Sequence, residues 1–333
     1  MERMSILTIA NKITNEDEAY RYLEELRWGK DRAGQACPHC GSMDKFYFLQ
    51  PKNGARRTGT AVRESKSARR VWKCAACRKQ FSVTTGTIFH ASHISLRVWL
   101  MVVFEMRSNK NGLAAREVER KYDLTPKSAW FMLHRVREAM KKEPLVGMLS
   151  GTILADETYI GGLPKNKHQQ GRKRPGGGKG IAGQPHHKIA VLSLLDKRTG
   201  EVRSRVMPNV TAPDLAKAIA EQVDIGQSTL HTDGAYLYRV LGRDFVKHEW
   251  VDHYKHEYVR GNVTTNHVEG YFSQLKRSID GTHHHVSGKH LPRYLAEFDY
   301  RYTTRKLSDT ARTHMLVDRV AGRRLAYRPL KNG

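Results

Sequence analysis

The stretch TILADETYIGG, residues 152–162, has the pattern of a β-strand that ends in an acidic pair and two glycines. Apolar and β-branched residues lead into Asp156 and Glu157, and the glycines then favour a turn. The stretch STLHTDGAY, residues 228–236, predicts another strand, which ends at Asp233. Carboxylates at the ends of two strands predict a mixed α/β sheet that carries an acidic site.

The residues between and after these strands predict the rest of the same domain. The stretch KIAVLSLLDKRTGEVRSRVM, residues 188–207, predicts two strands around a turn at residues 196–200. A helix is expected over residues 212–223. The stretch TTNHVEGYFSQLKR, residues 264–277, predicts a further helix, because two threonines are able to cap it and apolar residues recur at helical spacing.

Three carboxylates form a candidate metal site. Glu269 lies on the last of these helices, 36 residues after Asp233, and Asp156 is the third member. Two-metal phosphoryl transfer uses such oxygen ligands, and Mg²⁺ or Mn²⁺ is the expected ion. Lys276 follows Glu269 by seven residues, two turns along one helix face, where it is able to hold a DNA phosphate. An ordinary solvated helix surface is the alternative explanation for this Glu and Lys pair.

The charge balance predicts a polyanionic partner. The 333 residues include 58 Lys and Arg against 33 Asp and Glu, a net charge of +25. Nucleic acid is the first candidate partner and an anionic membrane surface is the second. There is no run of 18 apolar residues, and the first ten residues lack a signal-peptide pattern. We therefore expect an intracellular protein that binds double-stranded DNA and no membrane.

The four cysteines form two CxxC pairs. Cys37 and Cys40 stand in CPHC, and Cys74 and Cys77 stand in CAAC. In an intracellular chain this arrangement predicts a tetrahedral Zn²⁺ site, because each pair brings two thiolates to one ion. Two disulfides or four unrelated thiols are the alternatives. The basic insert PKNGARRTGTAVRESKSARR, residues 51–70, makes the gap between the pairs longer than in a minimal zinc ribbon.

Residues 112–140 predict two helices separated by a break at residues 122–125. Thr125 is the expected N-cap of the second helix, and Pro126 takes its first position. This layout is typical of a helix-turn-helix DNA-binding unit, although a plain helical hairpin gives the same pattern. Further helices are expected over residues 15–27 and 96–106. The candidate DNA-contacting residues are Lys127, Arg135 and Arg137 in the second helix, with Lys276 and Arg277 later in the chain.

Two other segments remain open to several interpretations. His283, His284 and His285 form a polar run, with His290 close behind, and metal binding, DNA contact and packing are the alternatives. No acidic or cysteine partner shows periodic spacing with these histidines. The glycine-rich basic stretch at residues 165–180 lacks the GxxxxGK[ST] order, so we expect a mobile loop there and no phosphate-cradling loop.

Together these motifs resemble a bacterial insertion-sequence transposase with an amino-terminal zinc ribbon and an ISXO-type DDE domain. The resemblance covers about residues 30–305 and implies a ribonuclease H-like fold, a divalent metal, and cut-and-insert chemistry on terminal inverted repeats. The matching segments are CPHCGS, CAACRKQFSVTTGTIFH, ADETYIGG, HTDGAYLY, TTNHVEGYFSQLKR and GTHHHVSGKHLPRYLAEFDYRY.

The resemblance also assigns roles to the acidic residues. It implies that Asp156 and Asp233 are the first two metal carboxylates. Wider relatives have Glu or Asn as the third catalytic residue, and this chain offers both Glu269 and Asn266, which lie at i and i+3 on one helix. We favour Glu269, because a carboxylate binds Mg²⁺ more strongly than an amide does.

The predicted organisation has four segments. They are an N-terminal helix and zinc ribbon at 1–90, a helix-turn-helix domain at 91–145, a ribonuclease H-like DDE domain at 150–310 and a basic tail at 311–333. The predicted function is a DNA transposase that binds inverted repeats, cleaves and transfers strands, and forms a homo-oligomer with DNA in the bacterial cytoplasm, associated with the nucleoid. The alternatives are a structure-specific nuclease of the same fold and a non-enzymatic DNA-binding regulator, which the intact acidic set disfavours.

Overall fold

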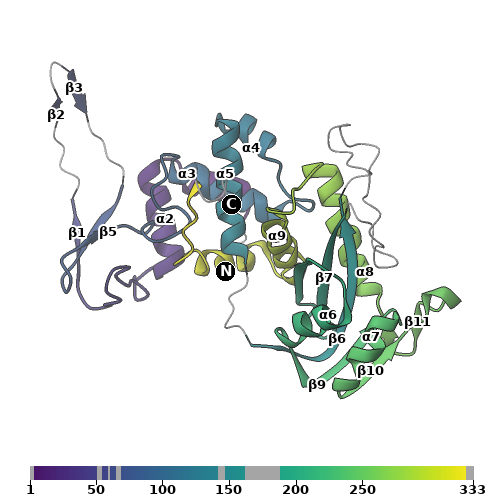
Figure 1. Cartoon of the computed structure of the whole chain (residues 1–333). Helices are drawn as coiled ribbons and strands as arrows, with labels where there is room; N and C mark the ends of the chain where they lie inside the picture. Colours follow the sequence, from purple (N-terminus) through teal and green to yellow (C-terminus); the bar gives the residue numbers. More distant parts are fainter. Residues whose placement is uncertain are drawn as a thin grey trace. The chain divides into compact units, whose positions relative to one another are not determined.

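The computed structural model describes residues 4–50, 55–58, 61–64, 69–141, 147–161 and 188–327, with only the backbone described at 55–58 and 61–64. The chain divides into two units (Figure 1). Unit 1 comprises Met1–Ala139 and Leu307–Gly333, and unit 2 comprises Met140–Lys306. Unit 2 is therefore an insertion in the sequence of unit 1, which differs from the predicted division into four consecutive segments. The basic stretch 165–180 lies outside the described residues.

Side chains cap the starts of α2 and α5 in unit 1. Asn15 accepts a hydrogen bond from the Glu18 backbone N–H (3.0 Å), and Thr125 accepts one from the Ser128 backbone N–H (3.3 Å). Among the described residues, no helix is long and apolar enough to cross a membrane. The helices are α1 (Ile6–Lys12), α2 (Glu16–Trp28), α3 (Leu96–Ser108), α4 (Ala115–Tyr122), α5 (Pro126–Met140) and α10 (Asp309–Asp318).

Helix α10 overlaps the start of the segment 311–333, for which the sequence predicts a basic tail. It contacts α2 and α3, and its Leu316 and Val317 are buried. The buried guanidinium of Arg107 on α3 pairs with the Asp309 carboxylate at 3.1 Å. The chain thus returns to complete unit 1 after unit 2. Sequence spacing within the last 23 residues could not indicate this packing, because the partners on α3 and α2 lie 200 or more residues earlier in the chain.

The zinc-ribbon segment is a small antiparallel sheet in the order β1-β4-β5. Glu24 of α2 accepts hydrogen bonds from Arg70 Nε (3.0 Å) and Trp72 Nε1 (2.9 Å), and all three residues are buried. These contacts fix the ribbon to α2. The strands are β1 (Phe46–Leu49), β4 (Val71–Cys74) and β5 (Gln80–Phe81), and the basic insert forms a hairpin of β2 (Ala55–Thr58) and β3 (Ala61–Glu64).

Unit 2 is built on a mixed five-stranded sheet in the order β10-β9-β6-β7-β8. Strands β6, β7 and β8 pair antiparallel, whereas β9 pairs parallel with both β6 and β10. This α/β sheet is consistent with the ribonuclease H-like transposase fold that the resemblance implies. The strands are β6 (Leu149–Ile160), β7 (Ile189–Asp196), β8 (Val202–Met207), β9 (Val223–Thr232) and β10 (Lys247–Trp250), with a separate small pair β11 (Val259–Arg260) and β12 (Val263–Thr264).

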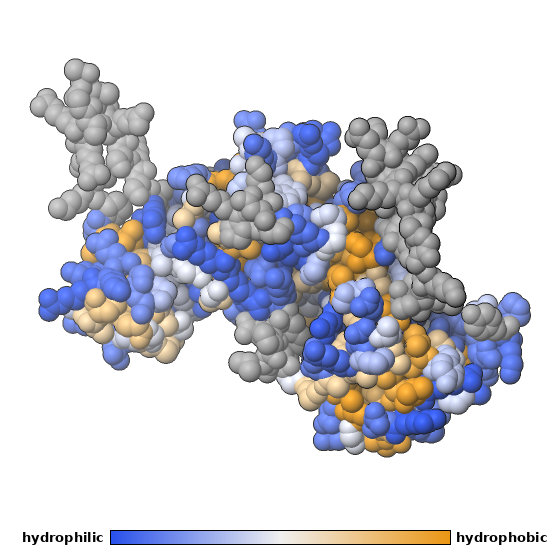
Figure 2. Space-filling view, in the orientation of Figure 1, coloured by the Kyte–Doolittle hydropathy of each residue, from blue (hydrophilic) through white to orange (hydrophobic). Residues whose placement is uncertain are grey.

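Helices cover both faces of this sheet, as the alternation of side chains along a strand requires. Ile153 and Ala155 of β6 pack with α6 and α7 on one face, whereas Leu154 packs with α8 and α9 on the other. Figure 2 shows apolar patches as well as hydrophilic residues on the surface of unit 2. The helical segments are α6 (Ala212–Ala220), α7 (Tyr236–Leu241), η3 (Gly242–Asp244), η4 (His253–Lys255), α8 (Asn266–Ser278), the π-helix η5 (Ile279–His283) and α9 (Leu291–Thr303).

The predicted turn between β7 and β8 is confirmed. The Asp196 carboxylate accepts hydrogen bonds from the Arg198 and Thr199 backbone N–H groups at 2.8 and 3.1 Å. Gly200 adopts a positive φ of 74°, which a side chain would strain. A short turn with an Asx-type bond and a glycine therefore fixes the hairpin register.

A polar network ties α8 and α9 to β8. The Asp299 carboxylate accepts hydrogen bonds from the Ser204 backbone N–H (2.8 Å), the Ser204 hydroxyl (2.6 Å) and the Tyr271 hydroxyl (2.7 Å). Burial raises the pKa of Asp299 to about 6, although these three donors oppose the rise. The network thus holds a carboxyl group that gains a proton more readily in the folded state than in the unfolded chain.

Because the folded-state pKa of Asp299 lies above its unfolded value, this group should make the free energy of unfolding fall as pH rises from about 4 to about 6. We expect Asp299→Asn to remove that part of the slope, which amounts to at most about 3 kcal/mol. Urea unfolding across this pH range measures it, with the exposed Asp280→Asn as the control. Identical slopes in wild type and Asp299→Asn would show that Asp299 does not titrate as described.

Candidate functional site

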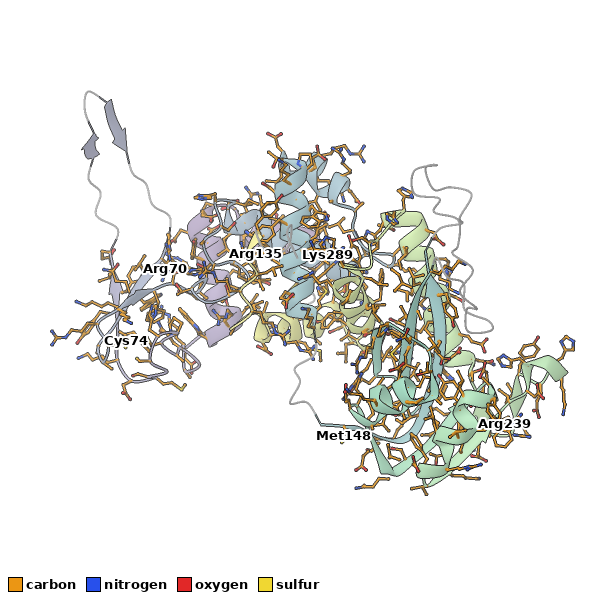
Figure 3. The ribbon with its side chains drawn as sticks, viewed as in Figure 1. Arg70, Cys74, Arg135, Met148, Arg239 and Lys289 are labelled. Carbon is orange, nitrogen blue, oxygen red and sulfur yellow. The ribbon has the colours of Figure 1, made fainter. Side chains whose placement is uncertain are left out.

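The four cysteines lie together in the ribbon of unit 1, where Figure 3 labels Cys74. The Cys37 and Cys77 sulfurs are 3.6 Å apart, the Cys40 and Cys74 sulfurs are 3.8 Å apart, and all four lie within 4.8 Å of one another. Tetrahedral Zn²⁺ with Zn–S bonds of about 2.3 Å places sulfurs about 3.8 Å apart. All four are free thiols, so the geometry fits the predicted structural zinc and does not support the two-disulfide alternative.

The thiols of this cluster influence one another's protonation. A hydrogen bond from the Lys79 backbone N–H, and then the neighbouring thiols, lower the pKa of Cys77 to about 7. Against a hydrogen bond from the Ser42 backbone, the neighbouring thiols raise the pKa of Cys40 to about 12. Loss of a proton from one thiol thus makes the loss of the next one harder, and a bound dication would stabilise several thiolates together.

Of the two predicted aspartates, Asp156 lies on β6 and Asp233 directly follows the parallel strand β9. Leu154 of β6 is paired with His231 of β9. Asp156 and Asp233 each follow the paired residue by two positions in the sequence. Because side chains alternate, Asp156 shares the face of Leu154, which is the face that α8 covers. The strand prediction needs one correction, since β6 does not end at Asp156 but continues to Ile160 by pairing with β7.

Mutual repulsion marks the carboxylates as one acidic cluster. Burial, then Asp233 and Glu157, and to a smaller extent Glu269, raise the pKa of Asp156 well above its usual value. Burial and Asp233 also raise the pKa of Glu157 to about 7, against a hydrogen bond with the fully buried Tyr238. A buried carboxyl group whose pKa is raised by neighbouring carboxylates marks a site that a cation would stabilise.

The oxygen-only donor set fits a hard divalent cation. In the described part of the chain, only the four cysteines bring three or more candidate ligand atoms within 4.8 Å of one another. The carboxylates are therefore more widely spaced than the thiols. Mg²⁺ and Mn²⁺ suit such a set, because Mg²⁺ keeps several waters and needs only one or two protein carboxylates.

Helix α8 carries the two candidates for the third position. Glu269 is partly buried and accepts a hydrogen bond of 2.6 Å from the Thr265 hydroxyl, and its carboxylate lies 3.5 Å from His253 Nε2. Asn266 is exposed. Lys276 and Arg277 are also exposed, and Arg277 donates from Nε to the Ser273 carbonyl (3.2 Å). Of the two candidates, Glu269 is the one that contributes to the raised pKa of Asp156.

Sequence reasoning missed the residues that support the acidic cluster, which are Tyr238, His253 and Trp250. Gly234, directly after Asp233, has a φ of 79°, and a Cβ there would lie 2.7 Å from Trp250 Cδ1. The glycine of HTDG was therefore a signal that another part of the chain approaches this turn closely. Tyr238 and His253 gave no comparable signal, because their partners come from other elements.

Two predicted DNA-contacting residues of α5 are corrected by their burial. Arg135, labelled in Figure 3, and Arg137 are only 4% and 1% exposed. Arg135 donates to the His90 carbonyl (2.6 Å) and lies over the Trp99 ring. Cationic side chains that pack along aromatic surfaces make a helix look more basic in sequence than its surface is. Lys127, in the first turn of α5, is exposed.

The histidine run does not gather into a metal site among the described residues. His283 packs edge-on against Tyr294, with ring centroids 4.8 Å apart, and also lies near Phe298. The His284 ring nitrogen Nδ1 lies 2.9 Å from the Asp280 carbonyl, within hydrogen-bond distance. For His283, these contacts agree with the packing alternative.

Two transposase domains match this chain. Residues 148–303 match the ISXO2-like transposase domain, and residues 14–80 match the transposase zinc-ribbon domain. An uncharacterized protein in transposable element ISH50 of Halobacterium salinarum is 28% identical over 296 residues, 86% of this chain and 90% of that protein. Because this relative is archaeal, the bacterial origin that the resemblance implied is not established.

A solved structure gives a much weaker likeness. A chain in the cryo-EM structure of the simian T-cell lymphotropic virus intasome in complex with PP2A regulatory subunit B56 gamma is 12% identical. The match covers 60% of this chain and 65% of that chain, with a TM-score of 0.26. This value is too low to support a conclusion about fold or function.

Cys74→Ser should lower bound zinc below one ion per chain and lower the melting temperature of unit 1, because a structural zinc contributes directly to folding. Elemental analysis and thermal unfolding of freshly reduced protein measure both effects. Ala76→Ser, which adds a hydroxyl in the same loop without removing a ligand, is the control. Wild-type protein that holds well under one zinc per chain would refute the structural zinc.

Proposed function

We propose that this chain, a member of the ISXO2-like transposases by the two domains that it carries, cleaves and joins DNA at the terminal inverted repeats of an insertion sequence. The observation that carries the proposal is the pairing of β6 with β9, which places Asp156 on β6 near Asp233, the residue after β9. After burial, Asp233 and, less strongly, Glu269 of α8 raise the pKa of Asp156, which supports one acidic site. Strand cleavage and strand transfer require such a set of oxygen ligands at one place.

Asp156, Asp233 and Glu269 would hold Mg²⁺ or Mn²⁺. The bound ions would supply activation of a water or a 3′-hydroxyl and stabilisation of the leaving oxygen. The protein contributes the paired inner strands β6 and β9, a fully buried Tyr238 that hydrogen-bonds with Glu157, and a turn at Gly234 against which Trp250 packs closely. Rigid support of this kind keeps the ligands in place while DNA enters.

Exposed cations in both units support a DNA partner. Lys276 and Arg277 lie exposed on α8, two turns after Glu269, and Lys127 lies exposed at the start of α5. Three residues join α4 to α5, with Asp123 in the left-handed conformation. We therefore retain the helix-turn-helix as a proposal in which the first turn of α5, and not its buried arginines, meets DNA.

A nuclease of the same fold would share the acidic cluster but would not join DNA strands. The presence or absence of joined products therefore separates it from a transposase. The regulator alternative gives no reason for a buried Asp156 whose pKa is raised by burial and by neighbouring carboxylates. We also propose that more than one copy of the chain acts on paired element ends, in the nucleoid where its substrate lies.

Asp156→Asn and Asp233→Asn should abolish cleavage of a labelled element end in Mg²⁺ while leaving DNA binding nearly intact, because these residues hold metal and do not read sequence. Glu269→Gln should be equally inactive, whereas Asn266→Ala should keep partial activity. Gel analysis of cut and joined products, beside an electrophoretic binding assay, measures each variant. Asp280→Asn, an exposed substitution outside the cluster, is the control.

Two outcomes would contradict this assignment in different ways. Full cleavage by Glu269→Gln, together with an inactive Asn266→Ala, would transfer the third position to Asn266. Full cleavage by Asp156→Asn or Asp233→Asn would remove the acidic cluster from the reaction altogether.

DNA binding should weaken steeply with salt, because the +25 charge implies counterion release. If Lys276 neutralises one phosphate, Lys276→Ala should reduce the slope of log affinity against log salt by about 0.9. Lys217→Ala, on α6 and therefore on the opposite face of the sheet, should leave the slope unchanged. Fluorescence anisotropy at several salt concentrations measures the slopes, and equal slopes for Lys276→Ala and wild type would exclude this contact.

A further inference from the structure

We propose that His253 and Thr265 are positioning residues that hold the Glu269 carboxylate ready for the metal, so that the segment between β10 and α8 supports the third ligand. This inference rests on the proposed function, because it assumes that Glu269 is a metal ligand. It adds to that proposal two residues and one segment that form no part of the acidic cluster itself.

The proposal starts from three polar atoms that meet at the start of α8. The Thr265 hydroxyl donates to Glu269 Oε1 at 2.6 Å. His253 Nε2 lies 3.2 Å from the same Thr265 hydroxyl oxygen and 3.5 Å from the same Glu269 oxygen. One carboxylate oxygen is thus approached by a hydroxyl and by an imidazole nitrogen.

The donors and acceptors of these three side chains determine the direction of each hydrogen bond. Thr265 has a single hydroxyl proton, and an ionised Glu269 can only accept. Because the short bond gives that proton to Glu269, the Thr265 oxygen is left as an acceptor towards His253. His253 Nε2 must then carry a hydrogen, which it directs at Thr265 and Glu269. The trio therefore forms a chain of donors that ends on the carboxylate.

The fold places His253 by several independent contacts. The Val251 backbone N–H donates to the Thr232 carbonyl (3.2 Å), which joins the end of β10 to the strand end before Asp233. The 3-10 helix η4 then begins at His253, and the His253 ring lies against the Tyr258 ring with centroids 5.3 Å apart. Strand β12, directly before α8, contacts both β9 and β10. The segment is thus anchored at the strand ends that carry the site.

Glu269 needs groups that position it, because its side chain is 40% exposed. A partly exposed glutamate samples many rotamers, and ordering it has a large entropy cost. Thr265, whose hydroxyl makes the 2.6 Å bond, is fully buried, so it offers a fixed reference point. Groups that orient a ligand in this way typically change metal affinity 10–100-fold when they are removed.

The test measures Mn²⁺ binding to the full-length, zinc-loaded chain by electron paramagnetic resonance, without DNA and without turnover. We expect His253→Ala and Thr265→Val each to weaken Mn²⁺ binding about tenfold. His253→Gln, which keeps a donor near the Nε2 position, should restore most of the affinity. Thermal unfolding of each variant reports whether the fold is intact. Thr265→Ala, which also removes the hydroxyl, replaces Thr265→Val if that variant does not fold, and Thr265→Ser, which keeps the hydroxyl, should bind Mn²⁺ like wild type.

The matched control is His256→Asn, which removes an exposed histidine three residues away and suits the positive φ of 58° at that position. It should bind Mn²⁺ like wild type. The double variant of His253→Ala and Thr265→Val should bind Mn²⁺ about as tightly as the single variant with the lower affinity. The two effects should not add, because both residues act through one carboxylate.

The outcomes separate this inference from the proposed function. Wild-type affinity in His253→Ala, with Asp156→Asn and Glu269→Gln impaired, would overturn the positioning role and leave the metal site standing. Equal weakening by His256→Asn would also overturn it. A wild-type chain that binds no Mn²⁺, or that binds it equally well after Asp156→Asn, would refute the metal site and the positioning role together.

Discussion

The parallel pairing of β6 with β9 fixes how close Asp156 and Asp233 can lie. The register aligns Leu154 with His231, so the next side chains on that face are the two aspartates. A shift of the register by one residue would turn one carboxylate to the opposite face of the sheet, towards α6 and α7. The position of α8 follows from the same pairing, because Leu154 and Val191 of the sheet pack directly against its apolar residues.

This arrangement has an electrostatic cost that the folded chain does not remove by itself. Asp156 is flanked by Asp233 and Glu157, and burial together with these neighbours raises its pKa. Asp299, in the same unit, is also buried but receives three hydrogen-bond donors. Asp156 and Asp233 also accept hydrogen bonds, from the Glu157 and Ala235 backbone N–H groups at 2.7 and 3.1 Å, but each of these bonds reaches only one oxygen of its carboxylate. A cation would stabilise the charge that such a site leaves uncompensated.

Local patterns in the sequence predicted the elements whose determinants are local. Thr125 marked a helix start, Gly200 marked a turn, and the CxxC spacing marked the thiol cluster. The features that the sequence did not predict depend on contacts between residues that are far apart in the sequence. The burial of Arg135 depends on Trp99 and His90, and the packing of α10 depends on α2 and α3. For the site, the strand-end aspartates could be found, whereas the support of Glu269 by His253 required the tertiary structure.

The central claim is that Asp156, Asp233 and Glu269 form one divalent-metal site under α8. Anomalous diffraction from crystals of the full chain grown with Mn²⁺ tests it most directly. The account predicts anomalous density within about 2.0–2.3 Å of carboxylate oxygens from both Asp156 and Asp233, with Glu269 on the same ion or on a second one about 3.5–4 Å away. Density that lies elsewhere, with the three carboxylates free of any ion at millimolar Mn²⁺, would contradict the account.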